Sequence, residues 1–134
     1  MKKIVLPFLV LVFALVAFTN VDNCSVSYKG IYAFKLDNEH SAILRFYEDG
    51  TVLASTSVND YLDVFTWFHK ENKDMVLTGK YKIKKCSIKF EVMGATGTQK
   101  YEGTIRGEAL EVKLTDEATK KTATRTYTYF PLGL

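Results

Sequence analysis

The chain has 134 residues, of which 47% are hydrophobic and 25% are charged, which is the length and composition of one globular domain. Eighteen basic residues stand against 15 acidic ones. Two of the basic residues, Lys2 and Lys3, belong to the N-terminal segment discussed next, and without them the charges nearly balance. A near-neutral domain lacks the strong positive field of a nucleic-acid-binding protein, so we predict no nucleic acid partner.

Residues 1–19 have the pattern of a secretory signal peptide. Two lysines precede an uncharged apolar run from Ile4 to Phe18. The run is shorter than the roughly 20 apolar residues that a membrane-spanning helix needs. We therefore predict cleavage and export to the periplasm, the cell envelope or the extracellular medium, with no stable membrane span after cleavage; an uncleaved anchor is the alternative. The rest of the chain divides into a lead-in, residues 20–27, and a β-barrel domain, residues 28–131.

From Tyr28 onward, short runs of alternating apolar and polar residues are separated by turn signals, a pattern typical of an all-β protein. Eight strands joined mostly by tight turns favour an eight-stranded antiparallel up-and-down barrel, with one short helix between strands three and four. The predicted strands are Gly30–Leu36, Ser41–Tyr47, Thr51–Ser57, Met75–Ile83, Cys86–Met93, Thr98–Ile105, Ala109–Thr115 and Thr122–Phe130.

The stretch RFYEDGTVL, residues 45–53, reads as a hairpin. Asp49-Gly50 is a strong signal for a two-residue type I′ turn, because both central residues of that turn need a positive φ. Such a turn pairs Phe46 with Leu53. Either the face that carries both residues forms the core, which leaves Arg45 and Tyr47 outside, or the opposite face, with Arg45 and Tyr47, points inward.

Apolar residues recur with helical spacing after the third strand, which predicts one amphipathic helix over Val58–Asn72. In an up-and-down barrel this link lies at the end opposite the Asp49-Gly50 turn. We therefore predict that Leu62, Phe65 and Phe68 cover the open mouth of the barrel at that end.

Export makes a disulfide between the two cysteines, Cys24 and Cys86, a natural expectation. The topology also brings both residues to one end of the barrel. Lipidation of Cys24, which soon follows an apolar run, is a second interpretation, although Asn23 stands where a small residue precedes a lipidated cysteine. Two free thiols are the third, and the sequence favours the disulfide.

Several segments resemble known families. Gly30-Ile31-Tyr32 together with Arg125 resembles the lipocalin arrangement in which a tryptophan of the first strand packs under an arginine of the last; Tyr32 stands where that family has tryptophan. The segments RFYEDGTV, WFHKEN, GKY and YEGTIRG are similar to parts of a family of small exported bacterial proteins of unestablished function, described as lipocalin-like. This resemblance covers about residues 28–130. It implies a lipocalin-like barrel and carries no activity with it.

No pattern of residues points to catalysis. His40 lies in a predicted turn and His69 in the predicted helix, and neither has companions at the spacing of metal ligands or of a nucleophile motif. We therefore predict a protein that is not an enzyme and has no catalytic residues, no metal and no cofactor.

Arginines and tyrosines within the strands are the candidate ligand-binding residues. An inward arginine with tyrosine hydroxyls can bind a carboxylate inside an apolar cavity. The predicted partner is accordingly a small apolar or carboxylate-bearing ligand, while protein partners stay open. The alternative function is a cell-envelope interaction or structural module with a filled core and no ligand. The candidates are Tyr32, Arg45, Tyr47, Phe65, Trp67, Tyr81, Tyr101, Arg125 and Tyr127.

Overall fold

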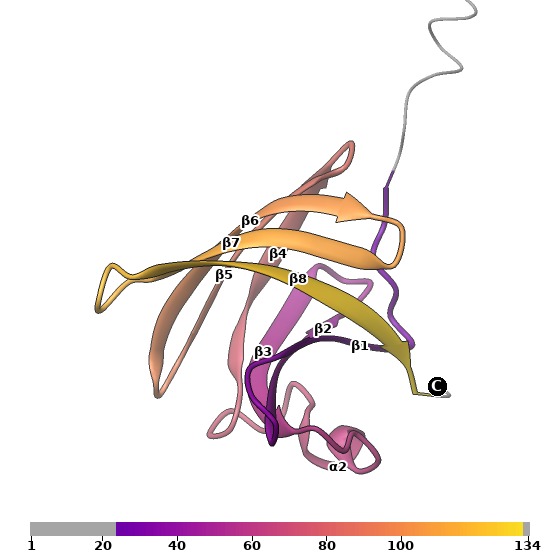
Figure 1. Ribbon diagram of the computed structural model, residues 1–134, viewed down its shortest axis with the longest axis vertical. Coiled ribbons are helices and arrows are strands. Elements are labelled where there is room, and N and C mark those ends of the chain that lie inside the picture. The colour runs from indigo at the N-terminus through magenta and orange to yellow at the C-terminus, as the bar shows by residue number, and fades with distance from the viewer. Residues whose placement is uncertain (1–23, 133–134) are drawn as a thin grey trace, which may run out of the picture.

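The computed structural model describes residues 24–132, and the chain folds there into a closed barrel of eight antiparallel strands (Figure 1). Each strand pairs with the next, and the last pairs with the first. The predicted fold class is therefore confirmed, while the predicted signal peptide lies outside the described residues. The elements are β1 (Gly30–Lys35), β2 (His40–Phe46), β3 (Thr51–Val58), α2 (Val64–Trp67), β4 (Leu77–Lys84), β5 (Ser87–Gly94), β6 (Gly97–Arg106), β7 (Ala109–Asp116) and β8 (Thr122–Pro131).

The β2–β3 hairpin differs from the prediction by one residue in register. Phe46 pairs with Val52, so Glu48, Asp49 and Gly50 form a three-residue loop. Gly50 alone takes a positive φ, +94°, and the Asp49 carboxylate accepts a hydrogen bond from the backbone N–H of Thr51 at 2.9 Å. This carboxylate bond stabilises a loop of one residue more than the type I′ turn.

The inner face of the barrel is a continuous hydrophobic core. The one-residue change in the β2–β3 register alters which residues of β3 belong to this core. Val52 lies inside, whereas Leu53, placed in the core with Phe46 by one of the two alternatives, lies on the outer face. Met75, predicted to begin the fourth strand, is exposed and precedes β4. The buried inward side chains are Tyr32, Ala42, Leu44, Phe46, Val52, Ala54, Leu77, Ile88, Phe90, Val92, Tyr101, Ile105, Leu110, Val112, Leu114 and Tyr127.

A short helix lies between β3 and β4, as predicted, but it is shorter than the expected Val58–Asn72 and packs on a different surface. Only Val64–Trp67 is helical. The apolar residues of the β3–β4 connection, residues 59–76, which we call the strap, pack on the outer face of β1–β3 and do not cover the barrel mouth. Val64 and Phe68 are fully buried there, while Leu62 is 92% exposed. The strap and α2 lie at one side of the barrel, below it in Figure 1.

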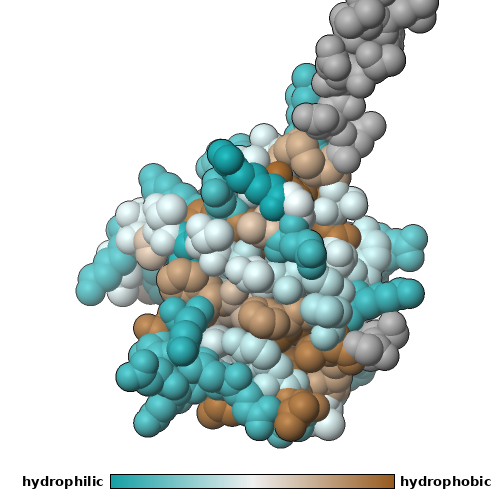
Figure 2. Space-filling model, turned by 45° about the vertical axis from the view of Figure 1, so that its right-hand side comes forward, coloured by the Kyte–Doolittle hydropathy of each residue, from teal (hydrophilic) through white to brown (hydrophobic). Residues whose placement is uncertain are grey.

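The outer face of β1–β3 explains this position. It carries Ile31, Ala33, Ile43 and Leu53, all of which would be exposed to water without a cover. Burying an Ile or Leu side chain stabilises a fold by about 1.5–3 kcal/mol, so covering this face stabilises the fold substantially. The outer faces of β4–β7 are mostly polar and have no equivalent cover. Brown apolar patches in Figure 2 appear mainly in the half of the molecule that holds α2 in Figure 1.

Polar contacts hold the strap in place. Ser41 on β2 contacts the Tyr61 hydroxyl at 2.7 Å, and the Ser55 hydroxyl on β3 donates to the carbonyl oxygen of Met75 at 2.9 Å. Lys70 donates to Asp49 at 2.6 Å. That ammonium, together with the Thr51 N–H, holds the pKa of Asp49 well below its usual range.

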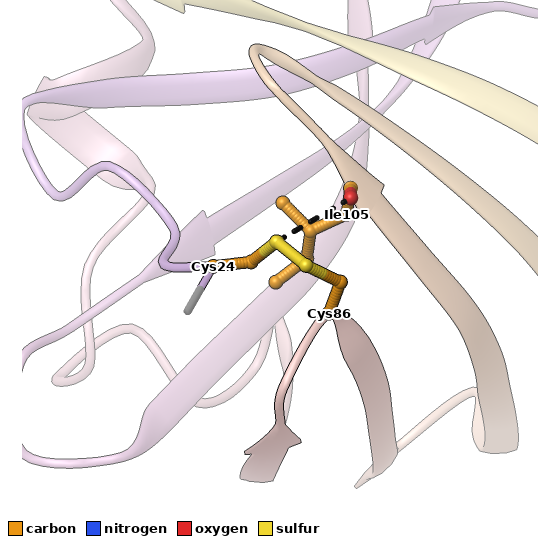
Figure 3. The surroundings of a disulfide bond; sticks show 3 residues. All are labelled: Cys24, Cys86 and Ile105. Carbon is orange, nitrogen blue, oxygen red and sulfur yellow. Dashed lines mark hydrogen bonds between the residues drawn. A yellow bond between two sulfur atoms is a disulfide. The ribbon is translucent and has the colours of Figure 1, made fainter. Parts of the chain in front are cut away.

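The N-terminal lead-in closes one end of the barrel, which we call the disulfide end. Cys24 and Cys86 are bridged, with their Cα atoms 4.8 Å apart, and the Cys24 sulfur lies 3.8 Å from the carbonyl oxygen of Ile105 (Figure 3). Val26 is buried in the core, and the Ser27 N–H donates to the Tyr32 hydroxyl at 2.9 Å. The predicted disulfide is confirmed, and it anchors a plug at this end.

Removing the disulfide should lower stability strongly. The bridge closes a sequence separation of 62 residues, for which the chain-entropy model gives about 4 kcal/mol. We expect the double variant Cys24→Ser/Cys86→Ser to lose about this much free energy of unfolding in urea titrations, and reduction of the native protein to reproduce the loss. A change below about 1 kcal/mol would show that the plug is stable without its bridge.

Substitutions in the strap should distinguish packing on the outer face of β1–β3 from packing over the barrel mouth. Phe68→Ala removes a fully buried ring and should cost about 3–5 kcal/mol, whereas Leu62→Ala should change stability by less than about 0.5 kcal/mol. Chemical denaturation of both variants provides the measurement. Comparable losses at the two positions would mean that Leu62 packs against the barrel after all.

Candidate ligand pocket

The barrel has an open end, opposite the disulfide end, where the inward side chains leave space. Near the disulfide end Phe46 contacts three aromatic rings edge to face, with ring centroids 5.1–5.6 Å apart. These rings, from Tyr32, Tyr81 and Phe90, fill the interior. At the open end the inward positions of β2 and β3 are the small residues Ala42 and Ala54. Large residues at one end and small ones at the other make the barrel hollow at one end only.

A pocket of about 290 Å³ occupies the open end. Its apolar walls include Leu36, Ala42, Ala54 and Leu77. It lies beneath the β5–β6 turn, and the last residues of the strap form part of its rim. The polar side chains that line it are Ser55, Thr56, Asp74, Thr96, Gln99, Tyr101 and Arg125.

Arg125 is the only basic residue among those that line the pocket. Its Nη1 donates to the Tyr127 hydroxyl at 2.9 Å, and its guanidinium lies 5.5 Å from the ring centroid of Phe34. Among the described residues, no carboxylate oxygen lies within 4.0 Å of its nitrogens. A guanidinium carries five N–H donors, so Arg125 keeps donors for a further acceptor.

Two tyrosines stand beside this guanidinium. The Tyr101 hydroxyl donates to Gln99 Oε1 at 2.9 Å, and its ring stacks on Phe90 with the centroids 4.5 Å apart. Burial, then the neighbouring Tyr127, raises the pKa of Tyr101, and burial raises the pKa of Tyr127. Both hydroxyls therefore stay neutral at physiological pH and remain hydrogen-bond donors.

Of the nine predicted ligand-binding residues, only Tyr101 and Arg125 line this pocket. A third, Tyr127, adjoins them through its hydrogen bond with Arg125. Tyr32 and Tyr81 face inward but belong to the filled disulfide end. Tyr32 packs against Tyr129, with the ring centroids 5.2 Å apart. Arg125 lies over the ring of Phe34 and does not pack on Tyr32, unlike the arginine in the lipocalin arrangement.

The other four predicted residues lie outside the barrel and pack with the strap. They are Arg45, Tyr47, Phe65 and Trp67. Arg45 donates from Nη1 to the Phe68 carbonyl oxygen at 2.7 Å, and its guanidinium lies 4.2 Å from the Phe65 ring centroid and 4.8 Å from that of Tyr47. Burial lowers the pKa of Arg45. These contacts give Arg45 a structural role in holding the strap.

Sequence reasoning missed the residues that create the cavity. Gln99 shares the inward face of β6 with Tyr101, so extending the alternation by one step would have found it. Ala42 and Ala54 carried a second signal, because small inward residues on neighbouring strands leave room inside a barrel. Asp74 joins the rim through the fold of the strap, which no local pattern indicated.

Within residues 24–132 there is no group of three or more His, Cys, Asp and Glu side chains placed to hold a metal ion. The described part of the chain also contains no helix with the length and apolar character needed to cross a membrane.

Comparisons of the chain with protein-family models, with curated proteins and with solved structures found no match.

Proposed function

We propose that the protein is a non-catalytic binding protein that holds one small carboxylate-bearing apolar ligand in the open end of its barrel. The observation that carries this proposal is Arg125, a guanidinium without a described carboxylate partner that lines a pocket whose walls are partly apolar and partly polar. Hydrogen bonds between a guanidinium and a carboxylate are among the strong ones in proteins, and a few convergent polar groups in an apolar pocket are typical of ligand sites.

The size of the pocket limits the ligand. At the packing density of protein interiors, 290 Å³ accommodates roughly ten to twelve non-hydrogen atoms. The stacked rings of Phe90 and Tyr101 lie toward the filled half of the barrel and would stop a longer chain. The proposal therefore concerns medium-chain or aromatic monocarboxylates, and a long fatty acid should not fit.

The ligand should be oriented by its carboxylate. Arg125 would bind the carboxylate, while Leu36, Ala42 and Leu77 would pack against the apolar part. The plug of the lead-in blocks the disulfide end, so the ligand would enter and leave at the open end.

We also propose that the protein is exported and belongs with the small lipocalin-like exported proteins that its segments resemble. The Cys24–Cys86 bridge supports export, because disulfides persist in oxidising compartments.

The ligand proposal can be tested with octanoate and octanamide, which have the same number of non-hydrogen atoms and differ in charge. Octanoate should bind in isothermal titration calorimetry and octanamide much more weakly. Arg125→Gln should weaken octanoate binding by roughly 10- to 100-fold, since a charged hydrogen bond contributes about 1.5–3 kcal/mol. Arg106→Gln is the matched control: it removes the same charge at the far end of the barrel and should have no effect.

Three outcomes would count against the proposal. Equal binding of octanoate and octanamide would show that the pocket does not recognise a carboxylate. Tighter binding of palmitate than of octanoate would contradict the size limit. Absence of binding by all three at millimolar concentration would favour the alternative function, an interaction or structural module without a ligand.

The export proposal predicts a processed N-terminus. Protein recovered from the periplasm or medium should begin between about Asn20 and Cys24, as N-terminal sequencing or intact mass would report. A protein that stays in the cytoplasm with Met1 retained would be incompatible with export.

A further inference from the structure

Charge is unevenly distributed between the two halves of the barrel. Residues 24–76, which include β1–β3 and the strap, contain five basic and eight acidic residues. Residues 77–132, which include β4–β8, contain eleven basic and six acidic residues. The near-neutral total thus hides a basic half, and such asymmetry is a recognised sign of an acidic partner.

The basic half presents six of its nine lysines on one surface, the outer face of β4–β7. Six exposed lysines define it, and we call it the basic face. They are Lys80, Lys82, Lys84, Lys89, Lys100 and Lys113.

Ion pairs satisfy only part of this charge. Lys89 pairs with Glu102 at 3.5 Å, and Lys100 pairs with Glu91 at 3.8 Å and with Glu117 at 3.3 Å. Among the described residues, no carboxylate lies within 4.0 Å of the ammonium groups of the other four lysines, one of which, Lys80, donates to the Thr51 hydroxyl at 3.0 Å. The basic face therefore keeps a net positive charge, which lies mainly along β4 and at Lys113 on β7.

The arrangement of these lysines is extended. Lys80, Lys82 and Lys84 follow one another along β4 at every second residue, which is roughly 7 Å between successive side chains. Lys82 is directly paired with Lys89 of β5, and like charges in such a pair repel each other. Two shallow depressions, of about 460 and 320 Å³, lie on this face, and both are lined by Lys82 and Lys89.

We propose that the basic face binds a linear polyanion, a hydrated polymer with phosphate or sulfate groups repeated along its chain. A row of lysines along a strand matches repeated charges on an extended chain, and an anion between Lys82 and Lys89 relieves their repulsion. This surface is separate from the pocket and does not depend on the ligand proposed for it.

The character of the face favours a polymer over a membrane surface. Binding to a lipid surface is strengthened by apolar side chains that insert between the headgroups. Of the large exposed apolar residues in the described chain, only Met93 lies on the strands of the basic face, at the end remote from Lys84. The exposed outward residues of β4–β7 include no aromatic ring that could stack on a base, so the feature recognised is repeated charge.

The test uses the full mature protein and inorganic polyphosphate, with binding followed by fluorescence anisotropy at 50 and 200 mM salt. The triple variant Lys82→Gln/Lys84→Gln/Lys113→Gln should bind at least ~10-fold more weakly than the native protein, with a smaller dependence on salt, since each phosphate contact adds about one to the slope of log affinity against log salt. A triple variant with the same charge change elsewhere, Lys35→Gln/Lys73→Gln/Lys121→Gln, should bind within ~2-fold of the native protein.

Heparin and phosphatidylglycerol vesicles identify the kind of partner. Heparin should compete with polyphosphate, and vesicles at the same charge concentration should bind more weakly than either polymer. Equal losses of polyphosphate affinity in the two triple variants would show that binding depends only on the net charge of the protein, and would overturn the proposal. Tighter binding to vesicles, or no binding to any polyanion at 50 mM salt, would overturn it as well.

Discussion

Pairing between the first and last strands is the contact on which the rest of the structure depends. Residues 30–33 of β1 lie antiparallel to residues 128–131 of β8, and this ladder closes the barrel. The fit is close: a Cβ atom on Gly30 would lie 2.1 Å from the carbonyl oxygen of Phe130, so only glycine allows the approach. Closure gives every strand an inner and an outer face. It therefore decides which half of each alternating pattern forms the core, and it gives every strand a partner on both sides.

The position of the strap follows from the apolar residues that barrel closure leaves on the outer face of β1–β3. Strands β1–β3 carry apolar residues on both faces, and the barrel interior can bury only one of them. The strap buries the other with Val64 and Phe68, and Arg45 fixes its course by donating to the Phe68 carbonyl oxygen. Because the strap is used on the outer wall, it does not cover the mouth, and the pocket stays open to solvent at that end.

The two proposed binding surfaces have different physical origins. The pocket exists because small residues occupy the inward positions at one end, while aromatic rings and the disulfide-anchored plug fill the other. The basic face exists because β4–β7 need no apolar cover and can present charge to water. One surface would select a single small carboxylate through a partly buried guanidinium, whereas the other would attract many weakly held charges. A protein with both could hold a small acid while attached to an acidic polymer.

The sequence by itself determined the barrel, the strand order and the disulfide. Alternation with period two reports which residues share a face, and turn residues report where strands end, so both are local properties. Only the tertiary structure decided the β2–β3 register, since the Asp49 carboxylate stabilises a three-residue loop in place of a type I′ turn. It also decided that Phe65 and Trp67 lie outside the barrel and that Arg125 meets Tyr127. Helical spacing shows that Val64 and Phe68 share a face, but which surface they cover depends on which apolar surface the other strands leave unburied, and that is a property of the closed barrel as a whole.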